Sequence, residues 1–148
     1  MKRVFFDTWG WAAIANKNDT HHEKIASFYK TFLLKKGIPV TTDYILAETI
    51  TLLRAKTDPG GVAVFIDTII EAVKNGMTVM ERINEERWEK AWKMSKKYSD
   101  KPYISFFDFS SFASILREKD QRPFLLSLQQ VSWNLPESYP MPLFGENL

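Results

Sequence analysis

Short apolar segments with strand character alternate with longer segments of helical periodicity along this 148-residue chain. Strands are expected at residues 4–6, 38–42, 77–80 and 124–128. Between them, apolar residues that recur every three or four positions predict helices. Strands alternating with helices form an α/β layer structure with a mostly parallel sheet. We therefore expect one α/β domain over residues 1–148, with residues 136–148 as an irregular, proline-rich C-terminal tail.

The expected helices have recognisable start and stop signals. They are placed at residues 8–16, 21–36, 44–56, 62–75, 84–98 and 105–118. Asp43 and Asn84 are of the residue types that cap helix N-termini, so each is expected to cap the helix that follows it. Gly37 and Gly76 stand where two of these helices end, in agreement with the preference of glycine for that position.

The composition excludes several classes of chemistry. The chain has no cysteine, so it has no disulfides, thiolate zinc sites or cysteine nucleophiles. Its two histidines, His21 and His22, are adjacent and are expected to be surface or packing residues, which argues against a multi-histidine metal site. No apolar run approaches the ~20 residues of a membrane span. The N-terminus does not resemble a signal peptide, so we expect a cytoplasmic protein without membrane contact.

Three strongly apolar segments contain one carboxylate each. Asp7 is the single charge in residues 4–16, Glu48 the single charge in 44–53, and Asp108 the single charge in 103–116. A carboxylate in apolar surroundings needs a partner, because desolvation costs several kcal/mol. Apart from the basic residues just before Asp7, none has a lysine or arginine within four positions. Converging carboxylates bind hard cations such as Mg²⁺ or Mn²⁺.

Each carboxylate also has a purely structural interpretation. Asp7 can cap the helix that starts after it, and Asp108 can form a capping box with Ser105. Glu48 lies in the middle of a helix, where capping is impossible, and would need an ion pair with a residue distant in the chain. That all three are structural is less plausible than any one case alone.

Three sequence motifs resemble a known family over nearly the whole chain. They are V-F-F-D-T-W-G-W-A-A-I-A-N followed by D-T-H-H, then V-T-T-D-Y-I-L-A-E-T-I-T-L-L, then Y-S-D-K-P-Y-I-S-F-F-D-F-S-S-F. In this order they resemble PIN domains of the VapC toxin type, metal-dependent nucleases that mostly belong to toxin–antitoxin pairs. The resemblance implies a three-layer α/β/α fold around a central, mostly parallel sheet of four to five strands.

The resemblance also implies a site. Asp7, Glu48 and Asp108 match the family's acidic positions and would be both catalytic and metal-binding, with Mg²⁺ or Mn²⁺ as the cofactor. The supporting residues would be Thr8, Asp100, Ser105 and Gln129. Thr8 is expected to form a hydrogen bond near Asp7 or with a phosphate oxygen. Ser105 is expected to cap and orient the helix that carries Asp108.

Gln129 marks a departure from the family pattern. A fourth acid usually follows the last core strand of these proteins, and Gln129 stands where that aspartate is expected. A glutamine oxygen can coordinate Mg²⁺, but it adds no negative charge. The substitution predicts weaker metal binding. It also supports an alternative, a weakened or inactive PIN-fold module that binds RNA or protein.

The leading expectation is a metal-dependent endoribonuclease, the toxin-like half of a pair, in which the cation activates water and neutralises charge on the phosphodiester. RNA would be contacted by rim residues such as Arg54, Lys56, Arg87, Lys93, Lys96 and Lys97. The resemblance implies a small antitoxin partner and a homodimer. Either core packing or interface contacts can account for Trp9, Trp11, Trp88, Trp92 and Trp133. A metal-dependent phosphohydrolase acting on DNA or a nucleotide is a further alternative.

Overall fold

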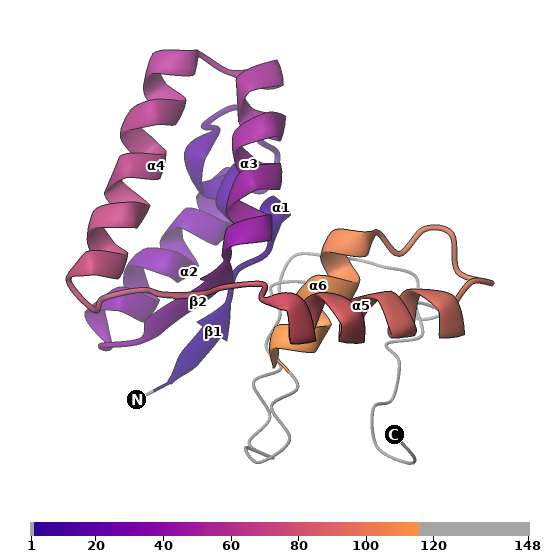
Figure 1. Cartoon of the computed structure of the whole chain (residues 1–148). Helices are drawn as coiled ribbons and strands as arrows, with labels where there is room; N and C mark the ends of the chain where they lie inside the picture. Colours follow the sequence, from indigo (N-terminus) through magenta and orange to yellow (C-terminus); the bar gives the residue numbers. More distant parts are fainter. Residues whose placement is uncertain (1, 116–148) are drawn as a thin grey trace.

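The computed structural model describes residues 2–115, which form a small parallel sheet and six helices (Figure 1). In chain order the elements are β1 (Arg3–Phe5), α1 (Thr8–Ala15), α2 (His22–Leu34), β2 (Ile38–Thr42), α3 (Asp43–Lys56), α4 (Pro59–Lys74), β3 (Val79–Glu81), α5 (Glu85–Lys97) and α6 (Phe106–Ile115). The expected fourth strand, Trp133, Gln129 and the C-terminal tail lie outside the described residues.

The described strands are all parallel and have the order β1-β2-β3. Phe5 of β1 is opposite Val40 of β2, and Val40 is opposite Val79 of β3. The α/β class with a parallel sheet is thus confirmed, and the described part contains three strands. Because the strands are parallel, the chain leaves all of them at one edge, where functional sites of such sheets form.

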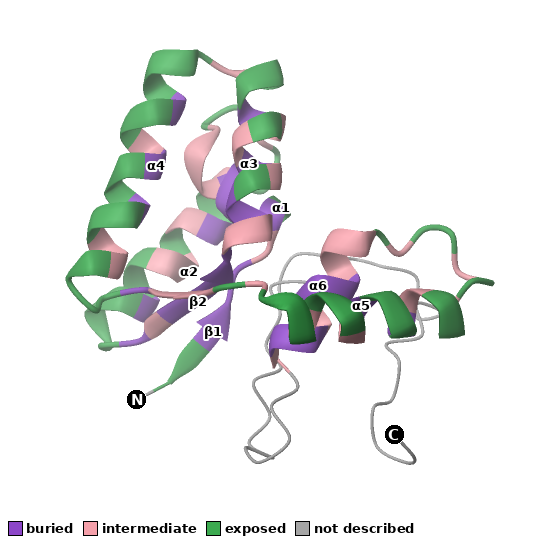
Figure 2. Cartoon of the chain, in the orientation of Figure 1, coloured by how far each residue is buried: buried purple, intermediate pink, exposed green. Residues whose placement is uncertain are grey.

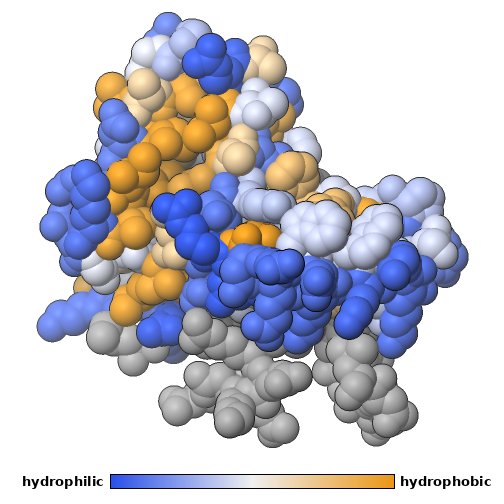
Figure 3. Space-filling view, viewed as in Figure 1, coloured by the Kyte–Doolittle hydropathy of each residue, from blue (hydrophilic) through white to orange (hydrophobic). Residues whose placement is uncertain are grey.

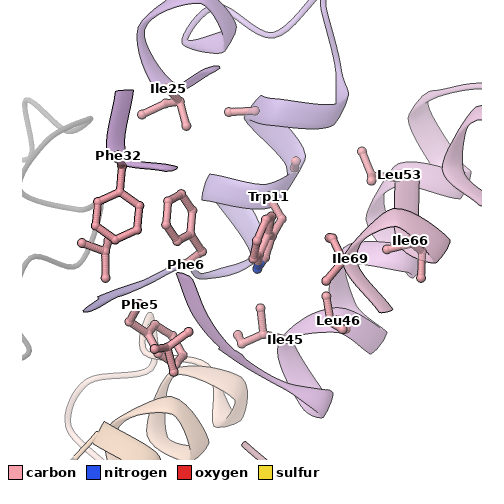
Figure 4. Packing of buried hydrophobic residues seen from close by; sticks show 14 of the residues in the cluster. Phe5, Phe6, Trp11, Ile25, Phe32, Ile45, Leu46, Leu53, Ile66 and Ile69 are labelled. Atoms are coloured by element: carbon pink, nitrogen blue, oxygen red, sulfur yellow. The ribbon is translucent and has the colours of Figure 1, made fainter. Parts of the chain in front are cut away.

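The main core lies around two aromatic side chains that follow β1. Phe6 is fully buried and contacts the ring of Trp11 at 5.0 Å and that of Tyr29 at 5.3 Å between centroids. Trp11 points between Phe6 and the aliphatic residues of α3 and α4 (Figure 4). Its indole N–H donates to the Thr41 hydroxyl at 3.0 Å, and this hydroxyl donates to the Phe6 carbonyl at 3.1 Å. Every polar atom of this buried trio therefore has a partner.

Helices α5 and α6 pack on each other through a second, smaller core. Its buried members are Ala91, Met94, Phe109 and Ala113. Figure 1 shows the two helices side by side at the sheet edge away from α4. The side of α5 that faces the viewer is exposed (Figure 2). Because α6 also contacts α3 and β2, this second unit brings the segment around residue 108 to the rest of the fold.

Two expectations about helix starts are wrong in detail. Thr42, not Asp43, caps α3, and its hydroxyl accepts from the Ile45 N–H at 3.0 Å. The Asp43 carboxylate instead accepts from the Ile83 N–H at 3.0 Å and pairs with Arg82 at 3.6 Å. β2 thus runs directly into α3, which leaves Asp43 free to hold the segment after β3.

Helix α4 begins earlier than the expected residue 62. Asp58 caps it by accepting from the Gly61 N–H at 2.8 Å. Pro59 then occupies the first turn, where its missing N–H costs nothing. None of the helices in residues 2–115 combines the length and apolar character that a bilayer crossing requires.

Candidate active site

Asp7 lies just after β1 and caps α1. Its Oδ1 accepts from the backbone N–H of Gly10 at 2.8 Å, as the structural interpretation of this residue predicted. The preceding residue, Phe6, is fixed on both sides: its N–H donates to the Val40 carbonyl at 2.8 Å, and its carbonyl accepts from Thr41. The Asp7 carboxylate is therefore held at the carboxyl edge of the sheet by the core beneath it.

Glu48 reaches the same region from the middle of α3. Its Oε2 accepts a hydrogen bond from the hydroxyl of Thr8, a buried residue of α1. Thr8 is expected to form a hydrogen bond near Asp7 or with a phosphate oxygen, and in the structure it forms one with Glu48, whose charge acts on Asp7. This bond joins two of the three acidic segments directly.

Asp108 lies in the first turn of α6 and forms the expected capping box. Its Oδ2 accepts from the Ser105 N–H at 2.7 Å, and the Ser105 hydroxyl accepts from the Asp108 N–H at 3.1 Å. The neighbouring Phe107 contacts the ring of Tyr44 on α3 at 6.2 Å between centroids. These contacts fix the Asp108 side chain and set α6 against the helix that carries Glu48.

The Asp7 carboxylate is affected by both of the other acids. The pKa of Asp7 is raised above its ordinary value of 3.8, mainly because burial disfavours its charged form. The hydrogen bond from Gly10 lowers the pKa, whereas the negative charges of Asp108 and Glu48 raise it. Asp108 and Glu48, which are distant from Asp7 in the sequence, therefore each lie near enough to Asp7 for their charges to act on it.

The chemistry of this acidic cluster (Asp7, Glu48 and Asp108) suits a hard divalent cation. Each carboxylate uses one oxygen for the hydrogen bond described above, and the Asp7 carboxylate also interacts with its own backbone N–H. Within the same residues, no three acidic or imidazole side chains are close enough to hold one ion together. The donor types fit Mg²⁺ or Mn²⁺, and sharing one ion would require the carboxylates to move closer.

The remaining predicted residues differ in their relation to the cluster. Asp100 is exposed and pairs with its neighbour Lys101 at 3.1 Å. Among the rim cations, Arg87 is partly buried and pairs with Glu81 at 2.8 Å, so its charge serves the fold. Lys56 lies over the ring of Trp9, with 5.6 Å from Nζ to the centroid.

Two features of the site were missed by sequence reasoning. The Thr8–Glu48 bond joins residues 40 positions apart, and no local pattern predicts such a partner. Trp9, two residues after Asp7, is 50% exposed although its segment reads as uniformly apolar. The available signal was its position beside Asp7 on the opposite side of the helix from Trp11.

Comparison with known proteins places this geometry in context. No family model matches the chain. It is 27% identical over 120 residues to the 23S rRNA-specific endonuclease VapC20 of Mycobacterium tuberculosis, in two strains, with 78% of this chain and 82% of the relative covered. The crystal structure of M. tuberculosis VapC20, a sarcin–ricin loop cleaving toxin, superposes with a TM-score of 0.60 at 26% identity, covering 74% of this chain and 78% of that one.

Proposed function

We propose that this chain is a PIN-domain toxin of the VapC type, as its similarity to VapC20 suggests, and that it acts as a metal-dependent endoribonuclease whose catalytic acids are Asp7, Glu48 and Asp108. The observation that carries this assignment is that the charges of Asp108 and Glu48, from two other segments of the chain, both act on the buried Asp7 carboxylate, to which the Thr8–Glu48 hydrogen bond adds a direct link between α1 and α3. A repulsive cluster lowers stability unless something positive binds there, so its presence points to function. The named RNA endonucleases among its relatives support RNA as the substrate.

The residues around the cluster have positioning roles. The N–H of Gly10 holds Asp7, the hydroxyl of Thr8 holds Glu48, and the N–H of Ser105 holds Asp108. Each bond leaves one carboxylate oxygen for Mg²⁺ or Mn²⁺. When bound, such a cation acts as a Lewis acid toward the phosphodiester and makes water a better nucleophile.

The test is cleavage of ribosomal RNA by purified protein with Mg²⁺, with Mn²⁺ or with a chelator. The relative acts on 23S rRNA, so intact ribosomes and free 23S rRNA are the first substrates, with cut sites mapped by primer extension. We expect cleavage with metal and none with chelator.

Asp7→Asn, Glu48→Gln and Asp108→Asn should each abolish this cleavage while the protein stays folded. Asp67→Asn is the matched control, because Asp67 is an exposed acid on α4, outside the cluster. Metal-dependent cleavage that survives all three cluster substitutions would refute the assignment. RNA that is bound but not cut would favour the alternative, a non-cleaving PIN-fold module.

The proposal extends to the protein's partners. A toxin of this family acts where RNA is translated, so we place it in the cytoplasm as a homodimer held inactive by a small antitoxin that covers the acidic cluster. Light scattering of the purified chain should give twice the monomer mass. Co-expression with a small cognate antitoxin should suppress both growth arrest and rRNA cleavage. A monomer, or unrestrained cleavage in the co-purified complex, would contradict these parts of the proposal.

A further inference from the structure

Two tryptophans of α5 are largely in solvent although α5 has a buried face of its own. Trp88 is 42% exposed and Trp92 is 46% exposed. The buried residues of the helix are Ala91 and Met94, which pack against α6. The second core thus forms without either indole. Large exposed aromatic surfaces are costly in water and mark binding surfaces.

These indoles belong to a continuous series of rings that leads to the acidic cluster. Trp92 and Trp88 are stacked at 6.2 Å with 26° between their planes, and Trp88 lies 5.5 Å from Phe106. Phe106 is the first residue of α6, and Asp108 follows two positions later. This aromatic ladder (Trp92, Trp88 and Phe106) therefore runs from the exposed face of α5 to the helix that carries Asp108.

Lysine side chains surround the end of the ladder at Trp92, which is the end distant from Asp108. Residues 90–101 contain five lysines and one acid, whereas the acids of α5 lie in its first five residues. Lys96 lies over the ring of Trp92, 5.8 Å from Nζ to the centroid, and both it and Lys93 are exposed. Figure 3 shows that hydrophilic side chains cover the near face of α5, while apolar atoms gather along α4. Flat rings beside cations match a nucleic-acid strand, whose bases stack and whose phosphates are anionic.

We propose that the aromatic ladder stacks unpaired bases of the RNA substrate beside the cleavage site, with Lys96 and Lys93 against the flanking phosphates. This inference rests on the proposed endoribonuclease function and adds a substrate-binding surface to it. Aromatic side chains stack on the flat face of a base, and because every base has such a face, stacking does not discriminate between bases. The ladder would therefore require single-stranded RNA next to the scissile bond, while leaving its sequence to other contacts.

The test separates stacking from charge by comparing two probes of equal charge. One is a fluorescein-labelled oligouridine of about ten nucleotides, within the usual range of single-strand binding sites. The other is an abasic ribose-phosphate oligomer of the same length. Affinities are measured by fluorescence anisotropy with the Asp7→Asn protein, which retains the ladder and should not cut the probe. We expect it to bind oligouridine about 10-fold or more tightly than the abasic chain.

Variants of the ladder should change this preference in a defined way. Trp88→Ala with Trp92→Ala should bind both probes equally weakly, whereas Trp92→Phe should retain most of the preference. Lys96→Gln should weaken both probes alike and reduce the slope of log affinity against log salt by about one. Leu34→Ala is the matched control, because Leu34 is an exposed apolar residue on α2. Thermal unfolding should show that every variant is folded.

Kinetics distinguish a failure of this inference from a failure of the proposed function. In the otherwise unmodified protein, the double tryptophan variant should raise KM for rRNA cleavage about 10-fold and leave kcat nearly unchanged, because the acidic cluster is intact. Cleavage with an unchanged KM, or oligouridine affinity that the double variant does not alter, would overturn the stacking surface and leave the ladder to a protein partner. Absence of cleavage by the unmodified protein would refute the nuclease and not the ladder, which the anisotropy measurement tests separately.

Discussion

Replacing Asp7 by asparagine should stabilise the protein while it abolishes cleavage. Burial and the charges of Asp108 and Glu48 raise the Asp7 pKa, so the folded state disfavours the ionised side chain. Asparagine is neutral, and its Oδ1 can still accept from the Gly10 N–H that Asp7 accepts from at 2.8 Å. The helix cap is therefore kept and the buried charge is removed. Active-site relief of this kind typically adds about 1 kcal/mol to the free energy of unfolding.

A second variant separates the two contributions to the free energy of unfolding, which are the removal of the buried charge and the retention of the helix cap. Asp7→Ala also removes the buried charge, but it loses the cap, which costs about 1 kcal/mol. The two effects nearly cancel, so we expect the alanine variant to have almost wild-type stability. For a domain of this size, 1 kcal/mol corresponds to a Tm change of about 3 °C. The asparagine variant should therefore melt about 3 °C above both the wild type and the alanine variant.

The stability difference between Asp7→Asn and the wild type should increase with pH. Below 3.8, the ordinary pKa of Asp7, the wild-type carboxyl is neutral in both the folded and the unfolded state, and the raised pKa has no effect. As the pH rises above 3.8, the unfolded state ionises first, so wild-type stability falls relative to the variant until the folded-state pKa is passed. The difference in the free energy of unfolding should thus be largest at pH 8 and become smaller toward acid pH.

The assay is urea unfolding with a chelator present, followed by circular dichroism from pH 8 to pH 4.5. The chelator matters because a bound cation would offset the repulsion in the wild type. Equal stability of wild type and Asp7→Asn at pH 8, or a gap that does not change with pH, would refute the strained carboxylate and the convergence inferred from it.

Three further predictions concern the metal, a turn and a cap. Mn²⁺ should raise the Tm of the wild type and leave that of Asp7→Asn unchanged in differential scanning fluorimetry, and equal shifts in both would contradict the cation site. Gly37→Ala should lower the free energy of unfolding by about 1–3 kcal/mol in urea titration, because the new Cβ would lie 2.2 Å from the Phe32 ring; an unchanged midpoint would show that this ring can move. Ser105→Ala should lower the free energy of unfolding by about 1 kcal/mol and reduce rRNA cleavage, whereas Ser105→Thr should keep wild-type stability and cleavage. Cleavage at the wild-type rate in the alanine variant would mean that the cap does not orient Asp108.

Most of the fold could be predicted from local patterns, and the failures lie where tertiary contacts decide. The Ser105–Asp108 box and the Asn84 cap are local, and both appear where they were expected. Asp43 was misassigned because Thr42 is a strand residue and a cap at once, which only the direct passage from β2 into α3 reveals. β3 begins at Val79, two residues later than the pattern predicts, because residues 77 and 78 belong to the turn after α4 although their types are common in strands.

The acidic cluster stays a prediction, and it rests on a different kind of signal. Burying a single carboxylate in an apolar segment costs free energy unless the charge has a partner. Three such segments in one sequence suggest that the three carboxylates share a partner. What the residues could not reveal is how the carboxylates are held. The partner of Glu48 is Thr8, 40 positions away, and the pairing depends on how α1 packs against α3. The direction of Trp88 and Trp92 away from the second core likewise follows only from the packing of α5 on α6.

The buried trio of Phe6, Trp11 and Thr41 links the stability of the core to the position of Asp7. Phe6 and Asp7 are consecutive, so the residue that closes the core also sets the backbone of a proposed catalytic acid. Small losses of packing or hydrogen bonding there would reach the active site before the whole domain unfolds. We therefore expect substitutions such as Thr41→Val to give conditional alleles of the proposed toxin, active in the cold and inactive when warmed. A toxin whose activity follows temperature could be switched on in a growing culture without any inducer.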